Sequence, residues 1–350
     1  MDITAILPIY NCKDRLKRHL QGVLKWVNLV KEVIVVDSGS TDGTLELARE
    51  ILSPYGAKFV HNPPGLYQSW NAGVSAATLK WIYFSTVEDP ITIDGLKHLW
   101  EVISKHDTDI AISAPEMRNH DGSELVNATM PSNLLAKAFQ EAGIKQHVFS
   151  RAESIALLCG LLPHGILGSS ASNMYRTNFL KQHPFPTDFG HIGDTAWGVS
   201  VSPIVKMAFT TTTCAQFLMQ TNHEEIDPES QKNLHRKLSQ LAVKTLKERV
   251  SDSPEITTMK GWFDFGNQLA LHQWEWIAGL NGYNQDLVGE LKKMEENVVH
   301  LKEAIITINL LQEQIQHLKT ANEKDEEENS RYLGLKGAVK CIKRSFRKRP

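Results

Sequence analysis

Residues 33–44 read VIVVDSGSTDGT, and this stretch decides the fold. Its four branched apolar residues are typical of a strand that is buried on both faces, as the strands of parallel sheets are. The small, acidic and turn-forming residues that follow predict a tight loop, and residues 44–52 have helical spacing. In open α/β sheets such loops lie at the carboxyl edge, where ligands bind. The stretch therefore predicts one corner of a nucleotide pocket.

The alternation of strands and helices continues on both sides of this stretch. Because parallel neighbours need crossover connections, it predicts an α/β fold with a doubly wound, Rossmann-like and mostly parallel sheet flanked by helices. The apolar runs that predict strands lie at residues 3–9, 32–36, 57–60, 81–85 and 169–176, and helical spacing occurs at 13–27, 44–52 and 69–79.

Composition sets the broad class of protein. With 350 residues and 41% hydrophobic content, the chain is long enough for about two domains with sizeable cores. Its net charge of −2 argues against nucleic acid as a partner, and its four scattered cysteines form no C-x-x-C pair. No signal peptide precedes the first strand, and no apolar run approaches the ~20 residues of a membrane span. We therefore expect a cytoplasmic protein.

Acidic residues follow two strands of the predicted sheet. Asp37 ends the second strand, and residues 86–89, TVED, follow the fourth. The carboxyl ends of neighbouring parallel strands share one crevice, so both clusters should face one ligand. Hard oxygen ligands suit Mg²⁺ or Mn²⁺, and a nucleotide diphosphate with a bridging metal would satisfy both clusters. The structural alternatives are that Asp37 only caps its turn and that the second cluster is a solvated turn.

At this point the residues resemble a known family. Four ordered motifs closely resemble the family 2 glycosyltransferases of the GT-A fold, and the likeness covers about the first 210 residues. The motifs are PIYN at 8–11, VDSGSTDGT at 36–44, NAG at 71–73 and WIYF at 81–84 with Glu88 and Asp89 after it.

The resemblance implies a nucleotide-sugar donor and the residues that bind it. The loop after strand one and the acid after strand two hold the nucleoside in that family, which implies Pro8, Tyr10 and Asp37. Asp42 is weaker, since it may simply start the next helix. The helix entrance at residues 65–71 resembles the segment that faces the donor diphosphate. There we expect Ser69 as the N-cap and Asn71 as an amide donor.

The metal motif departs from the family pattern. Thr86 stands where the first acidic residue is expected, Glu88 stands at the second position and Asp89 follows. The resemblance implies that Glu88 contacts both donor and metal, with Asp89 as a further ligand. Loss of the first carboxylate predicts weakened binding of Mg²⁺ or Mn²⁺.

Residues 189–197, FGHIGDTAW, resemble the region that carries the family's general base. Asp194 matches that base, which removes the proton of the acceptor hydroxyl as the sugar is transferred with inversion. The competing residue is Asp188, which looks like part of a surface turn, and the structural alternative for Asp194 is a helix cap.

Three further residues are acceptor or diphosphate candidates. His191 and Trp197 are expected at the acceptor site, although a lone histidine is more often structural and a helical tryptophan more often belongs to the core. His223 lies where some relatives place a further diphosphate or metal contact.

The remaining sequence predicts a modular chain. We expect a GT-A domain at 1–222, a helical subdomain at 223–284, a coiled coil at 285–322, and an acidic linker with a basic amphipathic tail at 323–350. Apolar residues alternate at spacings of four and three, which predicts a homo-oligomer through residues 287–318. They are Leu291, Met294, Val298, Leu301, Ile305, Ile308 and Ile315. The alternative is a single helix folded back on the protein.

The tail at 331–350 contains eight basic residues and no acidic one. Its apolar residues share one helical face, which predicts binding to an anionic membrane on its inner surface. The alternative is a basic tail without a target.

Two functions from different classes follow. The first is an inverting glycosyltransferase that moves a sugar from a nucleotide-diphosphate donor to a saccharide or lipid-linked acceptor, in surface polysaccharide or glycan assembly. The second is a weakly active or inactive nucleotide-sugar-binding relative that acts as an oligomeric scaffold. Thr86 favours the second, and Asp194 with the intact Asp37 motif favours the first. The donor nucleotide, the sugar and the acceptor are not decided by the sequence.

Overall fold

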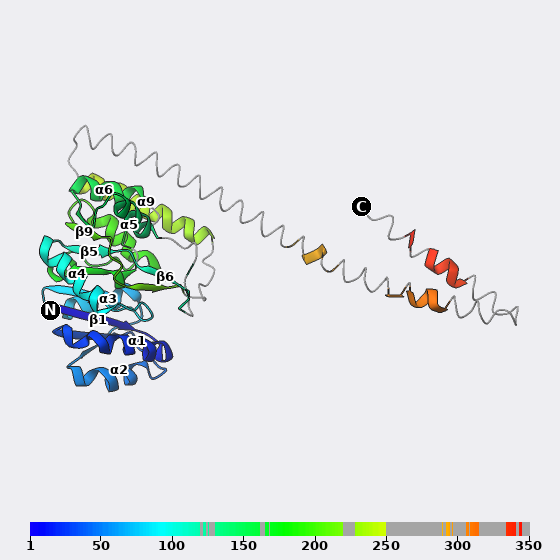
Figure 1. The fold of residues 1–350 in the computed structure, drawn as a ribbon, viewed down its shortest axis with the longest axis horizontal. Helices are drawn as coiled ribbons and strands as arrows, with labels where there is room; N and C mark the ends of the chain where they lie inside the picture. The colour runs from blue at the N-terminus through cyan, green and yellow to red at the C-terminus, as the bar shows by residue number, and fades with distance from the viewer. Residues whose placement is uncertain are drawn as a thin grey trace. The chain divides into compact units, whose positions relative to one another are not determined.

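The computed structural model divides the chain into two units, Met1–Trp274 and Glu275–Pro350 (Figure 1). In the first unit it describes residues 1–119, 122, 123, 125, 130–161, 165–167, 169–219 and 228–249. In the second it describes residues 289, 292–294, 296, 306, 307, 309–314, 334–340, 343 and 344.

The first half of the larger unit is a parallel α/β sheet. Its strands are ordered β3-β2-β1-β4, and each pairs in parallel with its neighbour. The elements are β1 (Ile3–Ile9), α1 (Lys13–Trp26), β2 (Glu32–Asp37), α2 (Thr44–Leu52), β3 (Lys58–His61), α3 (Leu66–Ala76), β4 (Trp81–Phe84) and α4 (Ile93–His106). The predicted alternation is confirmed, and the largest difference is that α3 begins three residues before its expected start.

The second half extends this sheet to eight strands, in the order β3-β2-β1-β4-β8-β5-β9-β7. A smaller ribbon pairs β10 with β6. The strands and helices are β5 (Ile110–Ser113), β6 (Glu116–Arg118), α5 (Pro131–Glu141), β7 (Gln146–Val148), α6 (Arg151–Gly160), β8 (Asn173–Arg176), α7 (Thr177–Gln182), α8 (Gly193–Val201), β9 (Met207–Thr210), β10 (Gln216–Leu218) and α9 (Pro228–Arg249). Short 3₁₀ helices are η1 (Val27–Leu29), η2 (Ser53–Tyr55), η3 (Ser170–Ser172) and η4 (Gly190–Ile192).

Two strands of this sheet run against the rest. β8 lies antiparallel between β4 and β5, and β7 lies antiparallel to β9. The sheet is therefore mixed and mostly parallel, which confirms the expected mostly parallel sheet. The strand expected at 169–176 begins only at Asn173, because the 3₁₀ helix η3 precedes it. The Ser169 hydroxyl caps η3 by accepting a hydrogen bond from the N–H of Ala171.

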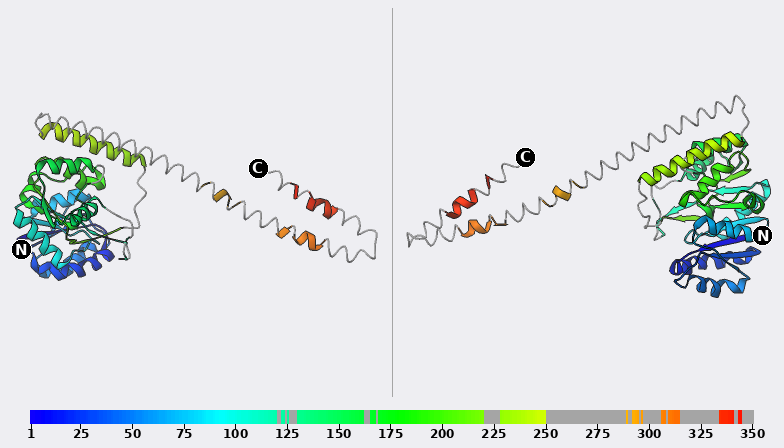
Figure 2. Two further views of the ribbon diagram at one scale, coloured as in Figure 1. Left: turned by 45° about the horizontal axis from the view of Figure 1, so that its top comes forward. Right: turned by 180° about the vertical axis from the view of Figure 1, so that it is seen from behind.

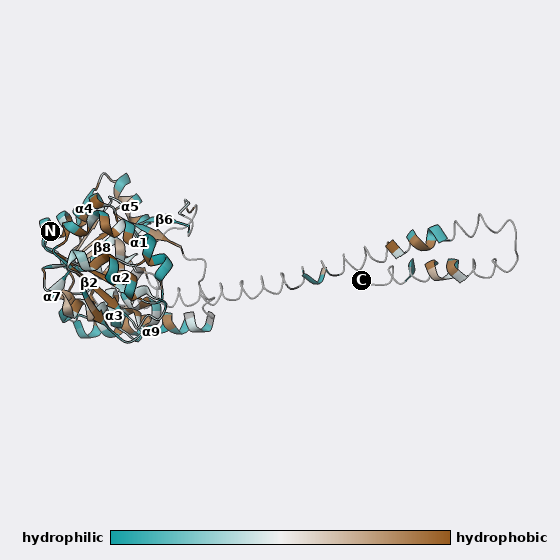
Figure 3. Ribbon diagram, turned by 90° about the horizontal axis from the view of Figure 1, so that it is seen from below, coloured by the Kyte–Doolittle hydropathy of each residue, from teal (hydrophilic) through white to brown (hydrophobic). Residues whose placement is uncertain are grey.

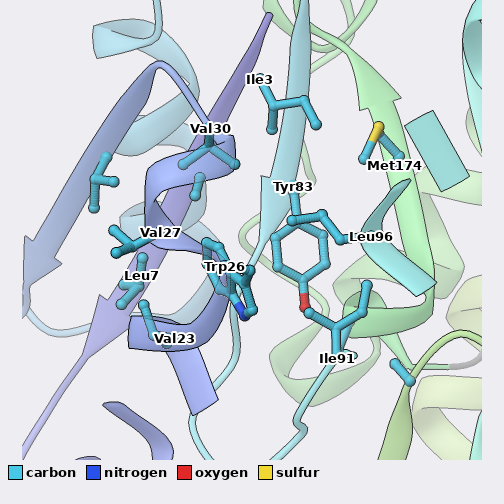
Figure 4. Close-up of a cluster of buried hydrophobic side chains, with 14 of the residues drawn as sticks. Ile3, Leu7, Val23, Trp26, Val27, Val30, Tyr83, Ile91, Leu96 and Met174 are labelled. Carbon is cyan, nitrogen blue, oxygen red and sulfur yellow. The ribbon is translucent and has the colours of Figure 1, made fainter. Parts of the chain in front are cut away.

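Each face of the sheet has its own apolar core. On one face α1, α2 and α4 pack on alternate residues of β1, such as Ala5 and Leu7. Figure 4 shows part of this cluster, in which Trp26 of α1 meets the edge of Tyr83 of β4 with ring centroids 5.7 Å apart. On the other face α3, α5, α7 and α8 pack on the remaining strand residues, which include Ile6. Burial on both faces explains the continuous apolar run of β2.

The helices α1, α2 and α4 bury an apolar side against the sheet, and Figure 3 colours the ribbon by hydropathy. The long helix α9 packs through Leu238, Ala242 and Leu246 against Ala196 and Val199 of α8 (Figure 2). This helix is the described part of the predicted helical subdomain, and residues 250–288 lie outside the described residues.

Most of the predicted coiled coil also lies outside the described residues. Residues 309–314 and 334–340 are helical, and Met294, one of the predicted seam residues, is 62% exposed. The other seam residues are not among those described, so the coiled coil and the oligomer remain predictions. In the described part of the chain, no helix combines the length and apolar character needed to cross a bilayer.

Candidate active site

Three loops meet at the carboxyl edge of the sheet. Ile9 at the end of β1 pairs in register with Asp37 at the end of β2, and the N–H of Ser38 donates to the carbonyl of Ile9 at 3.0 Å. The N–H of Ser85, which follows β4, donates to the carbonyl of Ile6 at 2.8 Å. The two predicted acidic clusters therefore follow strands that flank β1, as the parallel register requires.

Asp37 is 3% exposed and accepts hydrogen bonds from the N–H groups of Gly39 and Ser40, at 3.1 and 3.2 Å. Gly39 has a φ of 81°, a conformation that favours glycine, and this allows the chain to fold back over the carboxylate. Nδ1 of His61, at the end of β3, lies 3.9 Å from Oδ2 of Asp37. Asp37 thus caps its turn, and its predicted contact with a nucleoside remains a prediction.

The loop after β1 is fastened to the loop after β2. Asn11, with a φ of 41°, accepts a hydrogen bond from the N–H of Thr41 at 2.9 Å, and its own N–H donates to Ser40 Oγ at 3.1 Å. Before it, Pro8 is partly exposed and Tyr10 is 50% exposed, so both predicted donor contacts lie at an accessible edge.

Asp42 lies at the start of the next helix, which is the alternative to a contact with the donor. It accepts hydrogen bonds from the N–H of Lys13 at 3.1 Å and from the N–H and hydroxyl of Thr44, at the start of α2. The Thr44 hydroxyl bond, together with the backbone bonds, lowers the pKa of Asp42 below its ordinary value. Asp42 therefore joins the two loops and begins the helix.

The entrance of α3 differs from the expectation. Gly65, rather than Ser69, precedes the helix, so the N-cap prediction is wrong. Ser69 is 1% exposed; its Oγ donates to the carbonyl of Gly65 at 2.7 Å and lies 2.5 Å from Ser38 Oγ. The amide of Asn71 donates to the carbonyl of Phe185 at 2.8 Å and accepts from its N–H at 3.0 Å. Both side chains are engaged inside the protein, and their donor contacts remain predictions.

Glu88 lies between two cations of α1. Its carboxylate oxygens are 3.3 Å from Arg15 and 3.4 Å from Arg18, and its side chain is 7% exposed. Its φ of 80° is unusual for a residue with a side chain and turns the loop after β4 sharply. The predicted metal ligand is thus held by arginines in the protein as it stands.

Asp89 holds the same loop to the rest of the domain. It accepts hydrogen bonds from the N–H of Leu218 at 3.2 Å, from the Thr86 hydroxyl at 3.1 Å and from the Ser169 hydroxyl at 3.4 Å. Desolvation outweighs these bonds and raises the pKa of Asp89 to about 7. Its position as a metal ligand stays a prediction.

The fit of a metal can be judged from these donors. Among the described residues, no three His, Cys, Asp or Glu side chains gather closely enough to hold an ion. A protein cage is therefore not present in that part of the chain. Mg²⁺ and Mn²⁺ are often held by one or two carboxylates together with substrate phosphates, and Glu88 on its loop fits that pattern.

Asp194 lies in the first turn of α8. Its Oδ1 accepts a hydrogen bond from the N–H of Thr195 at 2.7 Å, and the Tyr67 hydroxyl lies next to its carboxylate. Burial outweighs these interactions and raises the pKa of Asp194 above its ordinary value, which makes the carboxylate a stronger base. The competitor, Asp188, is exposed and pairs with Lys237 of α9 at 2.7 Å. The geometry favours Asp194 over Asp188.

The acceptor candidates separate in the structure. His191 is exposed beside Asp194, where contact with an acceptor remains a prediction. Trp197 is 1% exposed, and its indole N–H donates to the carbonyl of His183 at 2.6 Å. The expected stacking of Trp197 on a sugar is therefore wrong, because its ring belongs to the core with Phe185 and Tyr175. His223 lies outside the described residues.

Sequence reasoning missed Tyr67, Arg15 and Arg18. The spacing of the two arginines on α1 was a signal that they share one side of a helix. Nothing in the local pattern linked them to Glu88, or Tyr67 to Asp194.

The fold and site define a class of protein: a GT-A-like α/β domain with a candidate ligand site at the carboxyl edge of its sheet. Residues 4–159 match the family model described as "Glycosyl transferase family 2". Residues 4–159 are thus similar to the family 2 glycosyltransferases, and the resemblance read from the four motifs is confirmed.

Curated relatives are partly similar to the chain. Glycosyltransferase GlyA of Streptococcus pneumoniae is 22% identical over 200 residues, which cover 56% of this chain and 27% of GlyA. The succinoglycan biosynthesis protein ExoO of Rhizobium meliloti is 26% identical over 168 residues, covering 43% and 48% of the two chains. The chain therefore spans between about a quarter and a half of the length of these relatives.

Solved structures show the fold. S. aureus TarS, residues 1–349 in complex with UDP-GlcNAc, has a TM-score of 0.55 at 16% identity, covering 73% of this chain and 69% of that one. The mannosyltransferase PcManGT of Pyrobaculum calidifontis, in complex with GDP-Man and Mn²⁺, has a TM-score of 0.51 at 15% identity, covering 78% and 73%.

Proposed function

We propose that the chain is an inverting glycosyltransferase that moves a sugar from a nucleotide-diphosphate donor to a saccharide or lipid-linked acceptor. The observation that carries this is the first turn of α3, which contacts both halves of the candidate site. Ser69 lies against Ser38, next to Asp37, while Tyr67 contacts Asp194. A nucleoside candidate and a base candidate therefore flank the same end of one helix.

The proposed reaction assigns a task to each residue. Pro8, Tyr10 and Asp37 bind the nucleoside, which places the diphosphate toward α3 and the loop of Glu88 and Asp89. Asp194 accepts the proton of the acceptor hydroxyl as its oxygen bonds to the anomeric carbon and the bond to the diphosphate breaks. Attack from the face opposite the leaving group inverts the anomeric centre. A divalent ion bound at Glu88 would supply positive charge beside the departing diphosphate.

The relatives support the substrate classes. TarS is solved with a UDP-sugar and PcManGT with a GDP-sugar and Mn²⁺, so the nucleotide of this chain's donor is left open. ExoO is named for succinoglycan biosynthesis, which supports a place in surface polysaccharide or glycan assembly. We further propose assembly into a homo-oligomer through residues 287–318 and attachment of the basic tail to the inner membrane surface.

A second candidate function is a weakly active or inactive nucleotide-sugar-binding scaffold. Thr86 replaces an acidic residue of the metal motif, and Glu88 is paired with Arg15 and Arg18. Both features weaken a metal site, and they favour this candidate over the enzyme.

The test is the Asp194→Asn variant of the full chain, assayed with a panel of nucleotide sugars in Mn²⁺. Loss of the base should lower transfer or donor hydrolysis by roughly 10²- to 10⁴-fold and leave donor affinity unchanged. Asp188→Asn is the matched control, because it removes a neighbouring carboxylate that faces α9, and it should retain activity. Normal turnover in Asp194→Asn would eliminate this base. A wild-type chain that binds a donor without turning over any would favour the scaffold.

A further inference from the structure

We propose that Tyr67 is the positioning residue of the reaction: its hydroxyl holds the Asp194 carboxylate toward the acceptor and relates it to the donor half of the site. This inference rests on the proposed function, in which Asp194 is the base.

The hydroxyl of Tyr67 lies at the junction between η4 and α8. It donates to the carbonyl of His191 at 3.0 Å and lies next to the carboxylate of Asp194, whose ionised form it favours. The hydroxyl therefore has one polar neighbour in η4 and one in α8. They lie on opposite sides of Gly193 in sequence, and Tyr67 therefore bridges the turn from which α8 begins.

The ring of Tyr67 is clamped in place. It is 3% exposed, stacks on Phe185 at a centroid distance of 5.8 Å and meets Trp70 edge-on at 5.1 Å. Gly193 packs directly on it, since a Cβ at that position would lie 2.4 Å from Cδ2 of the tyrosine. With the ring held on three sides, the hydroxyl has a defined position, which a base-orienting group requires.

The Tyr67 hydroxyl also acts on the charge of the base. Burial raises the pKa of Asp194, whereas the N–H of Thr195 and the Tyr67 hydroxyl favour the ionised carboxylate. His191 of η4 lowers the pKa slightly when charged, and Tyr175 of β8 is the other ionisable group that faces this carboxylate. Tyr67 is thus a neutral donor that keeps a desolvated carboxylate both ionised and oriented.

The same helix turn reaches the donor half. Ser69, two residues after Tyr67, is hydrogen bonded to Ser38 in the loop that begins at Asp37. Displacement of α3 would therefore move the base and the donor loop together. This explains why a base-positioning group belongs on α3 rather than on α8 itself.

The test is Tyr67→Phe, which keeps the ring packing and removes the hydroxyl. We expect kcat to fall roughly 10- to 100-fold, the cost of leaving a buried polar group without its donor, with KM for the donor unchanged. Because the lost hydroxyl favoured the ionised carboxylate, the acidic limb of the kcat profile should move to higher pH. Tyr83→Phe is the matched control, since within the described structure its buried hydroxyl has no hydrogen-bond partner.

Two further variants separate the outcomes. Adding Tyr67→Phe to Asp194→Asn should lower the residual rate no further, because a positioning residue acts through the base. If Tyr67→Phe does not fold, 3-fluorotyrosine at position 67 retains ring and hydroxyl, and its stronger donor should move the acidic limb to lower pH. If Asp194→Asn is inactive but Tyr67→Phe has a normal kcat, or a pH profile of kcat that does not move, only the proposal for Tyr67 is overturned. An active Asp194→Asn would overturn the proposed base itself.

Discussion

Glu32 and Asp37 lie at opposite ends of β2, and these two buried carboxylates have different roles. Glu32 is 8% exposed and accepts hydrogen bonds from the Thr4 hydroxyl at 2.5 Å, from Lys58 Nζ at 2.6 Å, and from the N–H and hydroxyl of Thr78 at 2.9 and 3.0 Å. These donors come from β1, β3 and the segment before β4. Glu32 therefore joins three parts of the sheet at the edge opposite the site.

The pH dependence of stability should report this carboxylate. Burial opposes the ionisation of Glu32, but the bonds from Lys58, Thr4 and Thr78 together outweigh it and lower its pKa from 4.5 to about 2. A lowered pKa contributes stability above the unfolded value and loses it as the pH falls toward the folded value. Glu32→Gln should thus reduce the free energy of unfolding by up to about 3 kcal/mol at pH 7.

Denaturant unfolding of the wild type and of Glu32→Gln between pH 7 and pH 2 measures this. The difference in the free energy of unfolding between the two proteins should be constant down to about pH 5. Below that pH it should become smaller. A difference that is the same at pH 7 and near pH 2 would contradict the role of the ionised carboxylate.

At the scale of elements, α1 shows how packing places charge. Its apolar stripe, which includes Leu16, Leu20 and Val23, is buried against the sheet. That contact sets the rotation of the helix, and Arg15 and Arg18 consequently reach Glu88 in the loop after β4. A cation at Glu88 has to compete with these guanidinium groups.

Arg15→Gln with Arg18→Gln should therefore strengthen the response to metal. Each partly exposed pair is worth at most about 1 kcal/mol, so loss of both pairs should lower the Mn²⁺ midpoint for donor binding by roughly 5- to 30-fold. Calorimetric donor titrations over a range of Mn²⁺ concentrations, with a chelator as the zero point, measure it.

The control for charge is Lys17→Gln with Lys25→Gln, which removes two exposed cations from the same helix. This variant should keep the wild-type midpoint. Glu88→Gln should remove the metal response altogether. If both double variants shift the Mn²⁺ midpoint equally, the effect comes from net charge. If neither shifts it, the arginines do not compete with a cation at Glu88.

For the whole molecule, the predicted coiled coil is a prediction of how many copies of the chain assemble. Val298→Glu with Ile305→Glu, both at predicted seam positions, should dissociate the oligomer, because burying a charge in the seam is costly. Light scattering of the full chain after size-exclusion chromatography measures the mass. Asn297→Glu with Gln314→Glu is the matched control. Both positions lie off the predicted seam, so this variant should leave the mass unchanged.

Donor binding should be the same in both variants, since the candidate site lies in the unit Met1–Trp274. A wild-type chain of monomer mass would contradict the predicted oligomer and favour a single helix.

The sequence by itself determined the local pieces of this protein. The strand and loop at 33–44, the helix that follows and the turn that places Asp194 at the start of α8 all depend on side chains within a few residues of each other. Periodicity and turn chemistry report such neighbours directly, and short motifs were enough to identify the family.

The tertiary structure decided what depends on distant partners. It inserted β8 antiparallel between β4 and β5, buried Trp197, moved the start of α3 to Leu66 and brought Tyr67 to Asp194 and Arg15 to Glu88. These outcomes follow from how helices and strands pack against one another, and a local pattern contains no term for a partner tens of residues away. The site is therefore an arrangement of locally predictable residues whose pairings are set by packing.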